Sequence, residues 1–115
     1  MTTKMRRSAL VIAAVGALVG MPMLNGMALA GHVRDAENHA RAAVSHGKEG
    51  HADVCAEHAD AALKSARGAK VKSPHLDEGI KHLMEAVKHG KAGHADTCTE
   101  HADGAATHLV EVKEQ

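Results

Sequence analysis

The stretch that decides the fold is His46-Gly47-Lys48-Glu49-Gly50-His51-Ala52-Asp53, which returns as His89-Gly90-Lys91-Ala92-Gly93-His94-Ala95-Asp96. The two stretches lie 43 positions apart. At the same offset, residues 32–67 align without a gap with residues 75–110, and 17 of the 36 aligned positions are identical. The identities include five histidines, the cysteine and both turn glycines. The chain therefore contains two copies of one structural unit.

Each copy has the apolar spacing of two helices joined by a turn. In the first copy, Val33, Ala36, Ala40, Ala43 and Val44 recur on one helical face, and the three other predicted helices carry similar stripes. Glycines are expected to end the first helix of each pair and to turn the chain. These glycines are Gly47 and Gly50 in the first copy and Gly90 and Gly93 in the second.

The fold class predicted from this pattern is all-α. No window alternates at period two, so we expect no strands. Residues 68–74 connect the copies; Ser73 can cap the third helix, and Pro74 suits its first turn. Four helices of about 15 residues with short connections predict an antiparallel up-down-up-down four-helix bundle built from two repeated helical hairpins.

The first 30 residues have the pattern of an export signal. Lys4, Arg6 and Arg7 precede an apolar run, and Ala28-Leu29-Ala30 supplies small residues at a cleavage site. We expect residues 1–30 to be a cleaved signal peptide and residues 31–115 to be the exported four-helix domain. A membrane anchor is the alternative, but the apolar run falls short of the roughly 20 residues that a spanning helix needs.

The composition of residues 31–115 excludes some partners. This segment holds all 11 histidines and has 11 basic against 14 acidic side chains, so it offers no basic face for nucleic acid. It has no Phe, Tyr or Trp, and its apolar residues are mostly alanine, which buries little area. We expect a monomer that leaves the membrane after cleavage, and whose small core needs a disulfide or a metal as reinforcement.

The histidines recur along the edge of the apolar stripes, at about 100° per residue. In antiparallel hairpins they are predicted to face one another in pairs. The predicted groups are His46 with His51, His39 with His58 and Cys55, and His32 with Ser65, followed in the second copy by His89 with His94, His82 with His101 and Cys98, and His75 with His108. Successive groups are seven residues apart, which corresponds to about 10 Å along a helix.

Pairs of imidazoles on facing helices are suited to bind transition metals. Imidazole nitrogen is a ligand for Cu, Zn and Ni, and the affinity of divalent ions rises toward Cu(II). Asp35 and Glu78 precede His39 and His82 by four residues; we interpret them as solvated helix carboxylates, with ring orientation or an oxygen ligand as the alternative. The candidate metal ligands are His32, His39, His46, His51, Cys55, His58, His75, His82, His89, His94, Cys98, His101 and His108.

Three interpretations of Cys55 and Cys98 stay open. A thiolate beside two histidines would suit Cu(I) or Zn. A disulfide is natural in an oxidising compartment and would join the diagonal second and fourth helices. Inert small core residues are the third interpretation. Spacing alone cannot decide, because a disulfide requires Cα atoms within about 7 Å.

Two other functions compete with metal binding. A bundle can hold haem between two histidines, but the chain lacks the C-x-x-C-H attachment motif and aromatic packing residues. A pH-responsive interaction protein would explain the histidine count, because imidazoles gain charge near pH ~6.5, but it would not explain the paired spacing. No nucleophile motif, H-E-x-x-H or phosphate loop is present, so we do not expect an enzyme.

Residues 32–51, which read His-Val-x-x-Ala-x-x-His-Ala-x-x-Ala-Val-x-His-Gly-Lys-Glu-Gly-His, resemble the small metal-binding protein family. The resemblance covers residues 32–110. It implies a periplasmic four-helix bundle that binds several divalent ions with copper favoured, in metal homeostasis, through the eleven histidines named above. Cys55 and Cys98 depart from the all-histidine pattern of the family, and Ser65 stands where another histidine would be expected.

Overall fold

The computed structural model describes residues 25–113 and forms a bundle of four helices. The helices are α2 (Asn25–Lys48), α3 (Ala52–Gly68), α4 (Pro74–Lys91) and α5 (Ala95–Val110). No strand occurs within these residues. The predicted all-α, up-down-up-down bundle of two hairpins is therefore confirmed. The basic and apolar segments of the predicted signal peptide lie outside the described residues, and α2 begins before the predicted cleavage site.

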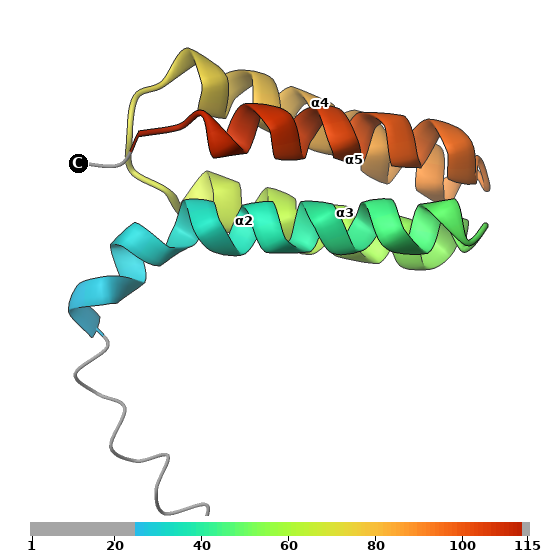
Figure 1. The fold of residues 1–115 in the computed structure, drawn as a ribbon, viewed down its shortest axis with the longest axis horizontal. Helices are drawn as coiled ribbons and strands as arrows, with labels where there is room; N and C mark the ends of the chain where they lie inside the picture. The colour runs from blue at the N-terminus through green and yellow to red at the C-terminus, as the bar shows by residue number, and fades with distance from the viewer. Residues whose placement is uncertain (1–24, 114–115) are drawn as a thin grey trace, which may run out of the picture.

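The two hairpins form two layers (Figure 1). α2 packs beside α3 in one layer, and α4 packs beside α5 in the other. Between the layers, α2 lies against α5 and α3 against α4, whereas α3 and α5 are diagonal neighbours across the core. No helix in the described part of the chain is long and apolar enough to span a bilayer.

Each hairpin turns through the same hydrogen-bonded cap. In the first hairpin, the amide of His51 donates to the carbonyl of His46 at 3.0 Å, and Gly50 donates to Gly47 at 3.0 Å. The second hairpin repeats both bonds at 2.9 Å and 3.0 Å. Gly50 has a φ of 87° and Gly93 a φ of 86°, the left-handed conformation that a Schellman cap requires after the helix. The turn thereby connects the backbones of two histidines directly.

Gly47 and Gly90 do not end their helices, contrary to the sequence-based prediction. Both lie inside helices, because the left-handed residue of each cap is the later glycine. Their role is close packing between the layers. A Cβ on Gly90 would lie 2.7 Å from Cβ of Ala56 and 3.0 Å from Sγ of Cys98. The absence of a side chain therefore lets α4 approach α3 near the disulfide.

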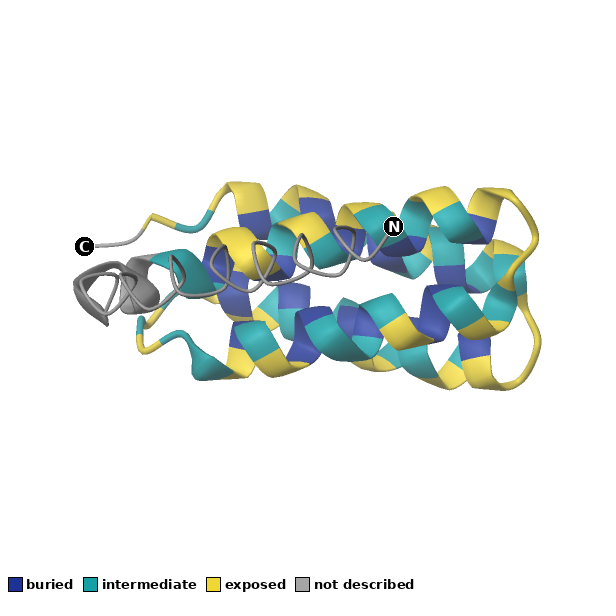
Figure 2. Ribbon diagram, turned by 90° about the horizontal axis from the view of Figure 1, so that it is seen from below, coloured by how far each residue is buried: buried dark blue, intermediate teal, exposed yellow. Residues whose placement is uncertain are grey.

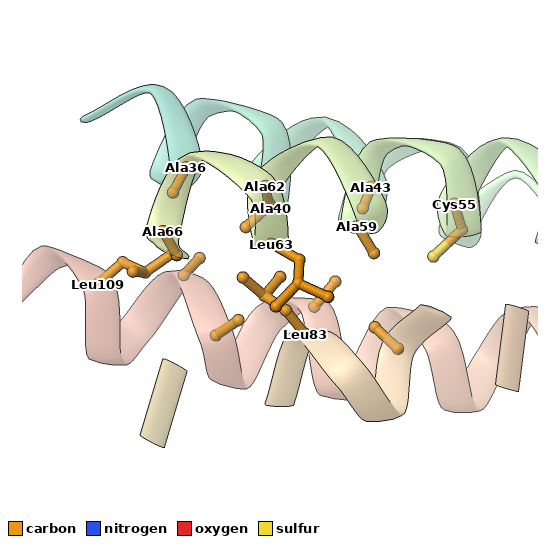
Figure 3. Packing of buried hydrophobic residues seen from close by; sticks show 14 of the residues in the cluster. Ala36, Ala40, Ala43, Cys55, Ala59, Ala62, Leu63, Ala66, Leu83 and Leu109 are labelled. Atoms are coloured by element: carbon orange, nitrogen blue, oxygen red, sulfur yellow. The ribbon is translucent and has the colours of Figure 1, made fainter. Parts of the chain in front are cut away.

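Buried positions occur along all four helices (Figure 2). Their side chains meet in a core between the two layers. Alanine dominates it, and the largest fully buried side chains are Leu83, Leu109, Cys55 and Cys98. Leu63 and Leu83 approach each other across the middle of the core (Figure 3). Because each alanine buries little apolar area, the few larger side chains supply much of the hydrophobic stabilisation.

A disulfide joins Cys55 of α3 to Cys98 of α5, with Cα atoms 6.5 Å apart. Both cysteines are fully buried. The interpretation that places them among the metal ligands is therefore wrong for this oxidised form. The physical reason is that the diagonal arrangement of α3 and α5 brings equivalent core positions of the two repeats within bonding range.

The start of α4 agrees with the sequence-based prediction. The hydroxyl of Ser73 accepts a hydrogen bond from the amide of Leu76 at 3.3 Å, and Pro74 occupies the first turn. This cap satisfies one of the amides that a helix start leaves without a partner. It therefore fixes where the second hairpin begins.

Candidate metal-binding site

Four imidazole rings of the first hairpin form a continuous row between α2 and α3, which we name the first ladder. It consists of His39, His46, His51 and His58. The ring centroids of His39 and His58 are 5.8 Å apart, and those of His46 and His51 are 6.3 Å apart. These two contacts join histidines that the hairpin places opposite each other, and we name them direct pairs. A diagonal pair, His46 and His58, is closer still at 5.1 Å.

The second hairpin carries a longer row between α4 and α5, the second ladder. Its six rings are those of His75, His82, His89, His94, His101 and His108. The direct pairs are His75 with His108 at 5.6 Å, His82 with His101 at 5.6 Å, and His89 with His94 at 5.9 Å. The diagonal pairs are His82 with His108 at 5.4 Å and His89 with His101 at 5.6 Å. All five predicted histidine pairs with two imidazoles are therefore present.

The diagonal contacts show that successive pairs are not isolated, as the spacing of about 10 Å along a helix had suggested. Side chains on an α-helix lean toward its N-terminus. In an antiparallel hairpin, rings on the two helices therefore lean in opposite directions. His46 leans away from the turn and His58 leans toward it, so they meet between two levels at 5.1 Å. The lean converts separate pairs into a continuous ladder.

The rings of both ladders lie outside the core, because the buried cluster of the four helices contains none of these histidines. The rings are exposed or half-buried. Two ring pairs place nitrogens within 3.3 Å of each other: Nδ1 of His75 with Nδ1 of His108, and Nδ1 of His82 with Nδ1 of His101. Two nitrogens at this spacing, near the surface, can converge on one ion after a small rotation of the rings.

A glutamate completes a three-ligand group on each ladder. In the first hairpin, Oε1 of Glu49 lies 3.4 Å from Nδ1 of His46 and 3.7 Å from Nδ1 of His51. In the second hairpin, Oε1 of Glu85 lies 3.6 Å from Nε2 of His89. One ligand atom from each member of the groups His46–Glu49–His51 and Glu85–His89–His101 lies within 4.8 Å of the others.

Sequence reasoning missed both glutamates. It considered Asp35 and Glu78. Glu78 lies 3.8 Å from Nζ of Lys81, and its charge acts to raise the pKa of His82, but neither carboxylate belongs to the three-ligand groups of the described residues. A difference between the repeats could have pointed to both glutamates: Glu49 aligns with Ala92, and Glu85 aligns with Ala42. Carboxylates that differ between two otherwise matched histidine rows indicate where the copies have diverged in ligand set.

Nδ1 of His46 supports the suitability of this arrangement for a metal. This nitrogen is inaccessible to solvent and makes no hydrogen bond, although Oε1 of Glu49 lies 3.4 Å from it. A buried polar atom without a partner costs free energy, and a bound cation would satisfy its lone pair. Imidazole nitrogen and carboxylate oxygen are ligands for divalent transition metals, so the residues present fit such an ion.

His32 lies outside the first ladder. Its ring packs against the end of α3, where a Cβ on Gly68 would lie 3.2 Å from it. No other histidine ring pairs with it in residues 25–113. The first ladder is therefore shorter than the second at this end, in line with the presence of Ser65 where the second copy has His108.

Two histidines in the ladders have lowered pKa values. Burial lowers the pKa of His58, and repulsion from His46 and His39 lowers it further. Burial also lowers the pKa of His82, followed by repulsion from His101 and His108. The lowered pKa values favour the neutral form of both rings, which is the form that binds metal.

The metal-free protein is expected to lose stability as the pH falls below about 6.5, the ordinary histidine value. Because the pKa values of His58 and His82 are lower in the folded state, the unfolded chain binds more protons. The stability that these two histidines contribute is fully present above their pKa in the unfolded chain. It is lost as the pH falls through their lower pKa values in the folded protein. Urea unfolding at pH 7.5 and pH 5.5 would measure it. The His58→Gln/His82→Gln variant should depend less on pH; equal dependence would contradict the assignment.

A helical bundle that carries rows of facing histidines with glutamates beside them defines a class: proteins that bind metal ions between helices. The family model described as small metal-binding protein matches residues 4–112. The chain belongs to this family, so the resemblance identified from its sequence is confirmed. The family is one of metal-binding proteins rather than of enzymes. A comparison with individual curated proteins finds no match.

Proposed function

We propose that this protein buffers transition-metal ions in the periplasm by holding several of them along its two ladders. The observation that carries the proposal is the convergence of ten imidazoles into two rows, each with a carboxylate within reach. Family membership supports metal binding itself. Binding would be stoichiometric, and ions would be released when protons compete for the imidazoles.

We propose copper as the favoured ion, with Zn and Ni as alternatives. The ligands offered by the described residues are imidazole nitrogens and carboxylate oxygens, because both cysteine sulfurs are in the disulfide. Such ligands favour divalent ions over Cu(I), and Cu(II) is at the top of the affinity order. The disulfide also supports an oxidising compartment, and thus export. We propose that the protein acts in metal homeostasis or detoxification.

Calorimetric titration of the mature chain with Cu(II), Zn(II) and Ni(II) tests the proposal. The His51→Ala/His58→Ala variant removes one ring from each direct pair of the first ladder. We expect it to bind fewer ions while the second ladder keeps its full capacity. The matched variant His94→Ala/His101→Ala should show the converse loss. Wild-type capacity in both variants, or no saturable uptake by the wild type, would contradict the proposal.

A further inference from the structure

The two hairpins place their glutamates on different kinds of histidine pair. Glu49 joins His46 and His51, which are a direct pair. Glu85 joins His89 and His101, which are a diagonal pair. This difference is fixed by the sequence, since neither glutamate has a counterpart in the other repeat. The two ladders therefore differ in which two rings bind an ion together with the glutamate.

Ring sharing limits how the second ladder can be filled. A neutral imidazole has one nitrogen lone pair, since the other nitrogen carries a proton, so each ring binds one ion. The three direct pairs use all six rings. The two diagonal pairs use four rings and leave His75 and His94 without a partner. The direct arrangement therefore holds more ions, and the diagonal arrangement holds fewer.

The diagonal group has the better ligand set for a first ion. One ligand atom from each of Glu85, His89 and His101 lies within 4.8 Å of the others, so Glu85 adds an anionic third ligand to this pair of rings. No direct pair of the second ladder has such a carboxylate among residues 25–113. The group is also less exposed than its counterpart at the first turn: the His89 side chain is 28% exposed, whereas that of His46, the equivalent residue of the first repeat, is 39% exposed. Partial burial strengthens the attraction between a carboxylate and a cation.

We propose that the first ion to enter the second ladder binds at Glu85, His89 and His101, and that the ladder re-pairs into its three direct pairs as more metal arrives. The inference rests on the proposed metal-binding function. At low load the second ladder holds one ion by three ligands. When more metal is bound, the three-ligand site is replaced by the three direct pairs, which together hold more ions. The first ladder has no such conflict, because its three-ligand group leaves His39 and His58 as an intact pair.

Two variants separate the first-ion site from the capacity of the ladder. Glu85→Gln removes the charge from the diagonal group but keeps every imidazole. We expect it to weaken the first ion of the second ladder by about tenfold or more, with no change in the number of ions bound at saturation. His94→Ala removes one direct pair, so we expect one ion fewer at saturation and unchanged affinity for the first. Glu37→Gln is the control, because Arg41 occupies that carboxylate at 2.7 Å.

Residue-specific NMR of the whole mature chain provides the readout. At about one fifth of an equivalent of Cu(II), paramagnetic broadening in the second hairpin should centre on His89 and His101 and spare His75. Saturating Zn(II) should then perturb all six rings. The inference is overturned if His94→Ala weakens the first ion, if Glu85→Gln leaves its affinity unchanged, or if early broadening centres on His75 and His108. A wild-type chain that takes up no Cu(II) would instead refute the proposed function.

Discussion

Replacing both cysteines with alanine is expected to lower the free energy of unfolding by about 4 kcal/mol. The disulfide joins residues separated by 43 positions, and a loop of that length loses much conformational entropy in the unfolded chain when it is closed. The alanine-rich core has little hydrophobic stabilisation with which to compensate, because most of its buried side chains are single methyl groups. Thermal unfolding followed by circular dichroism should show a midpoint roughly 20 °C lower for a domain of this size.

Reductant supplies the matched control for this prediction. Wild-type protein unfolded and refolded in dithiothreitol should approach the midpoint of the Cys55→Ala/Cys98→Ala variant, whereas the variant itself should not respond to reductant. Because both ladders lie outside the core, the folded variant should keep its metal capacity at low temperature. A midpoint unchanged by the double substitution would show that the disulfide adds nothing to stability. A loss of metal capacity in the folded variant would show that the sulfurs act on the ladders.

The fold could be predicted from sequence because its signals are local. Helical periodicity gave the four helices, and the repeated turn gave their antiparallel order. The role of Gly47 and Gly90 could not be predicted, because it depends on how closely the two layers approach. A Cβ on Gly47 would fall on Oγ1 of Thr99, which belongs to the other hairpin. The disulfide was one of three open interpretations for the same reason: only the diagonal distance between α3 and α5 decides it.

The part of the candidate site that depends on hairpin geometry alone could be predicted from the sequence. A turn of fixed length sets which residues face each other, so the direct pairs followed from counting outward from Gly50 and Gly93. Diagonal pairs depend on the lean of the rings, which spacing along the axis does not express. The contribution of Glu85 depends on both that lean and its own rotamer. The missed features are therefore those set by side-chain direction rather than by backbone register.

Saturating metal is expected to stabilise the folded protein strongly. An ion that binds the folded state alone adds about 2.7 kcal/mol per site when its free concentration is 100 times its Kd. The facing rings of each ladder come from two helices, so unfolding separates rings whose centroids the hairpin holds close together, as in the 5.1 Å pair His46–His58. Several occupied sites should therefore raise the thermal midpoint by tens of degrees. Melting at pH 7.5 with Cu(II), and then with excess EDTA, measures the effect and its reversal.

Two comparisons show whether this stabilisation comes from the ladders. A variant with glutamine at His39, His46, His51 and His58 keeps the core and the disulfide but loses the first ladder, so its gain in midpoint should be smaller than that of the wild type. At pH 5 the gain should shrink in both proteins, because protons occupy the nitrogens that the metal needs. If the four-fold variant gained as much as the wild type, the ions would be binding elsewhere on the surface. If metal lowered the midpoint, it would be binding the unfolded chain in preference, since a ligand stabilises whichever state holds it more tightly.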